Sequence, residues 1–205
     1  MKPKYWNKGK LYLSKKDKVL KLLIEKYSND CLSININYFY CLLNSIIGQQ
    51  ISVSAASAIK KRFFLLNKNI NPTNILEIKN QSFKKVGLSK QKILYIKNIA
   101  IFFIENKNFI KNINKYNEKK IKEKLISIKG VGEWTVNMFF IFALGKSNIL
   151  PKKDLGLLKA ISLTYKIKLP IKDRDLEKLF KKWSPYNTIA TWYLWRSLDP
   201  IPVIY

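Results

Sequence analysis

The side chains that this sequence lacks limit the chemistry that it can perform. Its 205 residues include no histidine and only 13 aspartates and glutamates. Serine–histidine catalysis, histidine-ligated zinc and zinc-dependent deamination of bases are therefore excluded. The two cysteines, Cys31 and Cys41, are too few for an iron–sulfur cluster or a four-cysteine zinc site. If the chain is an enzyme, a carboxylate or a lysine must do the chemistry.

Asp154 is the acidic residue with the most informative surroundings. It follows LPKK and directly precedes LGLLKAISL, whose apolar residues recur at helical spacing. An aspartate here commonly caps a helix by accepting hydrogen bonds from the first free amides. A catalytic role is the alternative, and a carboxylate that is used for capping is only partly available to a substrate. Taken alone, the residues favour the cap.

The stretch IKGVGEW, residues 128–134, predicts a tight turn between two helices. Gly130 and Gly132 allow positive φ and let another group come close to the main chain. Free amides at the start of the following helix offer donors and a favourable dipole end to a phosphate. Such a turn can hold one DNA phosphate without reading sequence, although an ordinary turn between helices can have the same glycine spacing.

The net charge is the strongest compositional signal. Lysine and arginine number 39 against 13 acidic residues, which gives +26 and a pI of about 10.0. Such a field attracts polyanions, of which nucleic acid is the usual one. Lysine codons are rich in A and T, so drift in base composition is an alternative source of this charge. Only Arg62, Arg174 and Arg196 are arginines, which favours contacts with phosphates over bidentate reading of bases.

Helical spacing of apolar residues extends along almost the whole chain, and strand-like alternation is hard to find. This pattern predicts an all-α fold. The predicted helices span residues 16–28, 38–47, 52–66, 89–105, 117–128, 133–144, 154–165, 173–183 and 186–197. The predicted N-caps are Ser52, Ser89, Asp154 and Asp173. No linker or low-complexity segment interrupts the pattern, so we expect one compact, two-lobed helical domain over residues 1–205.

Neither end of the sequence nor its interior carries a membrane signal. No apolar run is long enough to span a bilayer, and the N-terminal segment MKPKYWNKGKLYLSKKD lacks the apolar centre of a secretory signal. We therefore expect a cytoplasmic protein without a membrane partner, associated with the nucleoid if the cell is bacterial.

Four segments in a fixed order resemble the helix-hairpin-helix (HhH-GPD) DNA glycosylase superfamily, and within it the DNA-3-methyladenine glycosylase II branch of AlkA-like and MAG-like enzymes. They are IIGQQISVSAA (46–56), VGLSKQKILYIKNIA (86–100), IKGVGEWTVNMFFIFALG (128–145) with LPKKDLGL (150–157), and WSPYNTIATWYLWRSLDPIP (183–202). No single segment is specific, but the ordered set is. The resemblance implies a helix-hairpin-helix motif at about residues 117–145, no N-terminal β domain, and a monomer that binds double-stranded DNA containing alkylated bases.

The same resemblance implies a monofunctional glycosylase of base excision repair. Such an enzyme flips an alkylated purine of the 3-methyladenine or 7-methylguanine type out of the duplex. It hydrolyses the N-glycosidic bond and leaves an abasic site without strand cleavage. An already cationic base departs without help from an acid, so one carboxylate that stabilises the cationic sugar is enough. Bifunctional members carry a lysine where this chain has Trp134, so the tryptophan implies base removal alone.

Site residues follow from the resemblance as well. Asp154 is implied to be the catalytic carboxylate. Trp134, Met138 and Trp195 are implied to line the pocket for the flipped base, where an indole attracts a cationic base by about 0.5 to 2 kcal/mol. Gln50 aligns with the residue that fills the gap left by the flipped nucleotide. The other implied DNA-binding residues are Lys129, Gly130, Val131, Gly132 and Thr135.

No cofactor and no iron–sulfur cluster are expected. The resemblance allows one Na⁺ or K⁺ ion at the hairpin, held by the main-chain carbonyls of Ile126, Ile128 and Val131. Two positions depart from the family pattern, because Met138 stands where a relative has a pocket tyrosine and Asn187 stands where the last motif has an arginine.

Several alternatives stay open at this stage. Gln50 can be an ordinary turn residue after Gly48, and any one tryptophan can be a core residue, as we expect for Trp192 and its neighbour Tyr193. The chain as a whole can be a non-catalytic helix-hairpin-helix DNA-binding module, or a glycosylase for another class of lesion.

Overall fold

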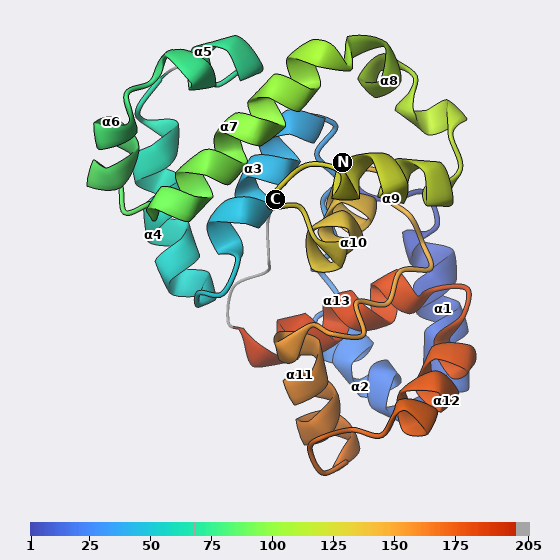
Figure 1. Ribbon diagram of the computed structural model, residues 1–205. Coiled ribbons are helices and arrows are strands. Elements are labelled where there is room, and N and C mark those ends of the chain that lie inside the picture. The colour runs from blue at the N-terminus through green and yellow to red at the C-terminus, as the bar shows by residue number, and fades with distance from the viewer. Residues whose placement is uncertain (68, 200–205) are drawn as a thin grey trace. The chain divides into compact units, whose positions relative to one another are not determined.

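The computed structural model of the protein describes residues 1–67 and 69–199 (Figure 1). Within these ranges all regular secondary structure is helical, which confirms the predicted all-α fold. None of the helices described is both long and apolar enough to cross a membrane. The helices are α1 (Trp6–Lys16), α2 (Lys18–Lys26), α3 (Tyr38–Gly48), α4 (Val53–Phe64), α5 (Pro72–Glu77), α6 (Asn80–Lys85), α7 (Lys90–Glu105), α8 (Lys107–Lys111), η1 (Ile113–Lys115), α9 (Glu118–Ile126), α10 (Glu133–Phe142), α11 (Leu155–Tyr165), α12 (Asp173–Trp183) and α13 (Asn187–Leu198).

The chain forms two compact units. Unit 1 contains residues 1–35 together with the described residues from 140 onward, and unit 2 contains residues 36–139. The single domain over residues 1–205 therefore stays a prediction, because it concerns how the two units associate. The last residues of the fourth family-like segment, 200–202, lie outside the described part of the chain.

Aromatic side chains fill the core of unit 1. Trp6 of α1 meets Trp192 of α13 edge to face at 5.2 Å between ring centroids and stacks on Tyr193 at 5.8 Å. Trp192 is 2% exposed and Tyr193 is fully buried, which confirms both as core residues. Gly9 lets α1 approach α13 closely, since a Cβ there would lie 2.2 Å from Cδ1 of Ile189. The N-terminal helix thus packs on the helix that carries Trp195.

A buried carboxylate joins distant segments of unit 1. Asp17, 1% exposed, is the N-cap of α2, and its Oδ1 accepts hydrogen bonds from the amides of Val19 and Leu20. Its Oδ2 accepts from groups near the ends of α11 and α12, namely Tyr165 Oη at 2.9 Å, Trp183 Nε1 at 3.1 Å and Lys182 Nζ at 2.9 Å. Each oxygen of this carboxylate is therefore satisfied by several donors.

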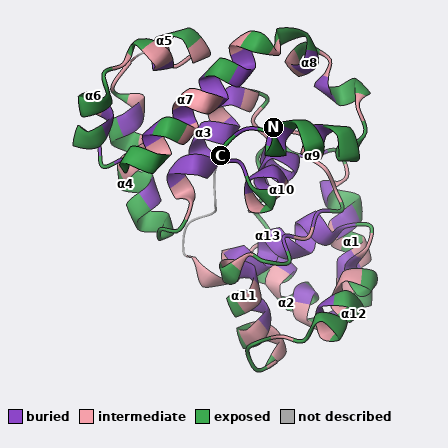
Figure 2. Cartoon of the chain, viewed as in Figure 1, coloured by how far each residue is buried: buried purple, intermediate pink, exposed green. Residues whose placement is uncertain are grey.

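Unit 2 is arranged around α3 and α7. α3 is buried along nearly its whole length and packs against α7, which also packs against α5 (Figures 1 and 2). One face of α7 is apolar and contributes Ile93, Ile96 and Phe103 to the core. Asn98 of the same helix donates a hydrogen bond to the turn between α9 and α10.

The predicted helices all occur, with ends that differ from the prediction by a few residues. Ser52, Ser89 and Asp154 are confirmed as N-caps by hydrogen bonds from backbone amides. Asp173 is not a cap, because Lys172 takes the N-cap position and Asp173 begins the first turn of α12, where its charge still complements the helix dipole. Helix α1 and the short helices α5, α6 and α8 were not predicted.

Asp17→Asn should lower the free energy of unfolding by about 3 kcal/mol at neutral pH, because buried donors would lose their anionic acceptor. Burial alone raises the pKa of Asp17, but hydrogen bonds, first from Lys182 and then from Trp183, outweigh it and leave the pKa below 3.8. The stabilisation is therefore present above pH 3.8 and is lost as the pH falls through the lowered pKa.

Urea unfolding at several pH values measures this effect. Asp175→Asn is the matched control, since Asp175 makes only ion pairs with partners that are largely exposed, and its loss should cost less than about 0.5 kcal/mol. Equal losses for the two variants would contradict the role assigned to Asp17.

Candidate active site

Asp154 is held at the start of α11 by two donors to the same oxygen. Oδ1 accepts a hydrogen bond from the Leu157 amide at 2.6 Å and from Trp195 Nε1 at 2.9 Å. The capping interpretation is therefore confirmed. The orientation of the carboxylate is fixed by a helix terminus and by an indole from α13.

Trp195 and Gly156 pack closely around the Asp154 carboxylate. Trp195 is 7% exposed and stacks on Phe142 with 6.1 Å between ring centroids and 13° between planes. Gly156 lies beside the carboxylate, where a Cβ would come within 3.2 Å of Asp154 Oδ1 and 3.8 Å of the Trp195 ring. Gly156 was missed in the sequence, although a glycine in the first turn of a helix is itself a signal of close packing.

The turn between α9 and α10 has the predicted helix, hairpin, helix geometry. The Val131 amide donates to the Ile128 carbonyl at 2.9 Å, and the Val136 amide donates to the Gly132 carbonyl at 3.1 Å. Gly130 has φ of +104°, and a Cβ there would lie 2.1 Å from Cγ of Tyr95. Gly130 is therefore required both by its backbone and by the ring that packs on it.

Both glycines of the turn can adopt positive φ, but only Gly130 does so, since the backbone of Gly132 lies outside that region. Gly132 is exposed, and a Cβ there would meet no protein atom within 4 Å. The fold itself does not require a glycine at this position. Its missing side chain leaves the main chain accessible from outside.

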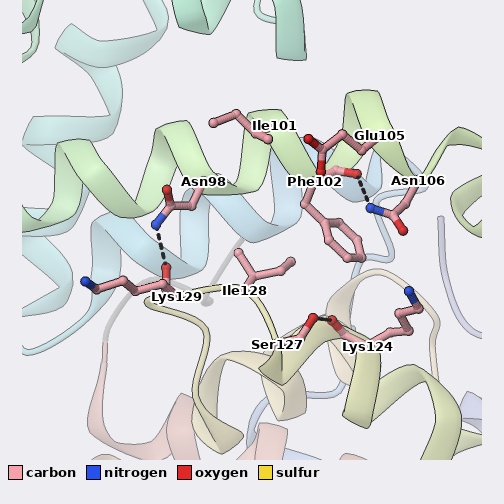
Figure 3. Close-up of a pocket in the computed structure, with 9 residues that line it drawn as sticks. All are labelled: Asn98, Ile101, Phe102, Glu105, Asn106, Lys124, Ser127, Ile128 and Lys129. Atoms are coloured by element: carbon pink, nitrogen blue, oxygen red, sulfur yellow. Dashed lines mark hydrogen bonds between the residues drawn. The ribbon is translucent and has the colours of Figure 1, made fainter.

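The other predicted hairpin residues divide into exposed and buried ones. Lys129 is exposed, while its carbonyl accepts a hydrogen bond from Asn98 Nδ2 of α7 at 3.2 Å (Figure 3). Val131 and Ile128 are 4% and 5% exposed, so their buried side chains anchor the turn to the hydrophobic core. Because the Ile128 carbonyl already accepts from Val131 in the closed turn, its second lone pair is the one that a cation would use, and that site stays a prediction.

A hollow of 420 Å³ lies between α7 and the hairpin (Figure 3). Phe102 and Ile128 contribute apolar surface to it, and Lys124 and Lys129 also line it. Four residues are predicted to act on the base, and none of them borders this hollow, namely Asp154, Trp134, Met138 and Trp195. The hollow therefore adjoins the predicted DNA-binding turn rather than the predicted pocket.

Three predicted residues lie on α10. Trp134 is partly exposed, as a residue that contacts a ligand must be. Met138 is 2% exposed and Thr135 is 1% exposed. Because the Thr135 side chain is buried, any contact of this residue with DNA must use its main-chain amide in the first turn of the helix.

The turn after α3 contains two adjacent glutamines whose side chains lie in different environments. Gln50 is exposed and has a left-handed backbone with φ of +58°. Gln49 points inward, and its Nε2 donates to the Gly130 carbonyl at 3.1 Å and to Thr135 Oγ1 at 3.0 Å. Gln49 was not singled out in the sequence, because nothing there distinguishes it from its neighbour.

The predicted residues fall into two groups. Asp154 and Trp195 contact each other directly in unit 1, whereas the hairpin, Trp134 and Gln50 belong to unit 2. The roles assigned to both groups, and the complete base pocket, stay predictions. Across residues 1–67 and 69–199, no group of three or more histidine, cysteine, aspartate or glutamate side chains could hold a metal ion.

Gly130→Ala should cost at least about 2 kcal/mol of unfolding free energy, because alanine must adopt a positive φ and displace the Tyr95 ring. Gly132→Ala is the matched control and should change it by less than about 0.5 kcal/mol, since its added methyl group meets no protein atom. Urea unfolding of the two variants measures the difference. A similar cost for both would contradict the roles assigned to the two glycines.

The sequence matches the model of one protein family, described as HhH-GPD superfamily base excision DNA repair protein, over residues 43–186. A putative DNA-3-methyladenine glycosylase of Bacillus subtilis is 30% identical over 189 residues, which cover 88% of this chain and 66% of that protein. An alkylbase DNA glycosidase-like protein of Schizosaccharomyces pombe is 31% identical over 160 residues, or 76% of this chain and 75% of that protein.

Comparison of the fold with solved structures also finds a DNA glycosylase. The structure of a 3-methyladenine DNA glycosylase of Schizosaccharomyces pombe, in complex with abasic DNA, superposes with a TM-score of 0.81 at 26% identity. The superposition covers 93% of this chain and 96% of that one. The family match extends over more than half of the chain and includes the hairpin and Asp154, so the chain belongs to the HhH-GPD superfamily of base excision DNA repair proteins.

Proposed function

We propose that this protein is a monofunctional DNA glycosylase that removes alkylated purines, such as 3-methyladenine and 7-methylguanine, from double-stranded DNA. The observation that carries the proposal is the Asp154 carboxylate, which the Leu157 amide and the Trp195 indole hold in one orientation. The names of the relatives support the substrate class. The abasic DNA bound in the matched structure is the kind of product that such a reaction leaves.

Asp154 acts by stabilising positive charge at the sugar. Departure of the base develops oxocarbenium character on the deoxyribose, and an alkylated purine carries its own positive charge and leaves as a neutral base. No general acid is needed, which fits a chain without histidine. A carboxylate about 4 Å from a unit positive charge contributes about 4 kcal/mol at an effective dielectric constant of 20, or roughly a thousandfold in rate.

Selection of the base is assigned to the indoles. We assign to Trp134 and to Trp195 stacking on a flipped cationic purine, which cation–π attraction favours over neutral bases. Met138, as a polarizable side chain, adds apolar contact. With tryptophan at position 134 there is no amine to form a Schiff base, so the DNA strand is left intact.

DNA is held through its backbone. The exposed main chain at Gly132, the Lys129 ammonium and the amides at the start of α10 contact one strand, and Gln50 fills the gap in the duplex. The net charge of +26 makes this binding strongly dependent on salt. The protein acts as a monomer, with a Na⁺ or K⁺ ion on the hairpin carbonyls of Ile126, Ile128 and Val131.

Purified protein should release alkylated purines from methylated duplex DNA and leave abasic sites, with strand breaks only after alkali. Asp154→Asn should lower the release rate about a thousandfold without loss of DNA binding, because the charge is removed while the cap is kept. Asparagine caps α3, α5 and α9 in this same protein. Chromatography of the released bases and a binding assay with an abasic duplex are the two measurements.

Asp173→Asn is the control, since Asp173 also lies at the start of a helix and should be dispensable. Tight DNA binding without release by the wild type would favour the non-catalytic helix-hairpin-helix module. Release of oxidised bases or uracil in place of alkylated purines would assign another class of lesion.

Trp195→Phe should slow base release about tenfold with unchanged DNA affinity, because phenylalanine keeps the stack on Phe142 but cannot donate to Asp154. Single-turnover rates on methylated DNA measure the effect. Trp183→Phe removes an indole donor from Asp17 instead, so it should lower stability and leave the release rate of folded protein unchanged. If both variants lost activity in proportion to stability, the orienting role of Trp195 would be wrong.

A further inference from the structure

Gln49 connects two turns that are far apart in the sequence. Its main chain ends α3, and its side chain reaches the hairpin, where Nε2 donates to the Gly130 carbonyl at 3.1 Å and to Thr135 Oγ1 at 3.0 Å. Gly130 lies 81 residues from Gln49 in the sequence, and Thr135 lies 86 residues from it. One amide group therefore fixes the distance between the turn at residues 49–52 and the turn at residues 128–132.

Helix α7 supports both turns from one side. Lys92, Tyr95 and Asn98 recur at intervals of three and share one face of this helix. Lys92 Nζ donates to the carbonyls of Ile47 at 2.7 Å and Gln49 at 2.8 Å. The Tyr95 ring packs on Gly130, and Asn98 Nδ2 donates to the Lys129 carbonyl (Figure 3). Lys92, Tyr95 and Asn98 of α7 thus support both turns.

The Lys92 ammonium is committed to this support rather than to the surface. Burial lowers the pKa of Lys92 from its usual value, which reflects removal of the ammonium from water. The two carbonyls that it binds belong to the last turn of α3 and to its C-cap, where a positive charge also complements the helix dipole. Lys92 therefore fixes the main chain of Gln49 while the side chain of Gln49 fixes the hairpin.

Gln50 lies between two anchored neighbours. On one side Gln49 is held by Lys92 and by the hairpin, and on the other side Ser52 caps α4 through the Ala55 amide at 3.2 Å. The left-handed backbone of Gln50, at φ of +58°, is imposed between these anchors. The exposed side chain of Gln50 is consequently presented in a direction that the hairpin helps to set.

We propose that Gln49 is a positioning residue that locks the Gln50 turn to the hairpin, so that one DNA duplex meets both at a fixed separation. This inference rests on the proposed function, because it assigns Gln50 to the gap left by a flipped base and the hairpin to the adjacent backbone. Gln49 is assigned this role through its two hydrogen bonds to the hairpin. The lock should matter most for DNA in which the gap exists, and least for intact duplex that is held by lysines alone.

The first test is amide hydrogen exchange of the free protein. Gln49→Leu should accelerate exchange at the Val131 and Val136 amides about tenfold, because the hairpin would lose two hydrogen bonds to its neighbour. Thr135→Val removes one acceptor and should give a smaller change in the same direction, which keeps the test available if Gln49→Leu folds poorly. Gln81→Leu, in exposed α6, is the matched control and should leave these amides unchanged.

The second test compares two DNA duplexes. Gln49→Leu should weaken affinity for a duplex with a stable abasic analogue about tenfold, and affinity for the undamaged duplex less than about twofold. A purely structural loosening would weaken both equally and would lower the melting temperature.

Unchanged exchange at Val131 and Val136 in Gln49→Leu would overturn the proposal, and so would an equal loss of affinity for both duplexes. Faster exchange together with a selective loss of abasic binding would establish it. If the wild type releases no base and does not distinguish the duplexes, the proposed function fails, and hydrogen exchange alone then decides whether Gln49 locks the two turns.

Discussion

One carboxylate, held at a helix N-terminus, is the constraint on which the site in unit 1 depends. A helix end supplies amides and a favourable dipole for an anion, and the Leu157 amide donates to the Asp154 carboxylate there. The bond from Trp195 brings the indole and the carboxylate into one rigid pair. Gly156 leaves the space in which the pair fits. This carboxylate is thus positioned by secondary structure rather than by a loop, which is how a site keeps its geometry.

In unit 2 the corresponding constraint is that the exposed backbone of the hairpin must be kept rigid. Turns that bind phosphate must present main-chain amides to solvent, and such segments are ordinarily mobile. In this protein the hairpin is closed by its own hydrogen bonds and packed from below by Tyr95 and Val131. Gln49 and Asn98 satisfy two carbonyls of the turn from outside it. The polar groups that face away from a ligand are used for support, and those at Gly132 are left accessible.

Much of the fold could be predicted from the sequence, because strongly periodic segments such as 89–105 and capping residues such as Ser89 are local signals. Helix α1 was missed because Gly9 weakens its pattern, and the reason for that glycine is a contact with Ile189 far along the chain. The roles of Asp17 and Gln49 could not be predicted for the same reason, since their partners lie many residues away. Asp154 and Trp195 were assigned through a family resemblance, and their direct bond became visible only in three dimensions.

The division of the chain into units also determines an order of assembly. Unit 2 is continuous from residue 36 to residue 139, whereas unit 1 combines residues 1–35 with the described residues from 140 onward. During synthesis the first two helices emerge long before α11, α12 and α13 exist to cover them. Trp6 cannot reach Trp192, and the Asp17 carboxylate cannot reach Trp183, until α13 and the end of α12, respectively, have been made. The unit that contains Asp154 and Trp195 is therefore completed only after the segment that forms the turns of unit 2 has been made.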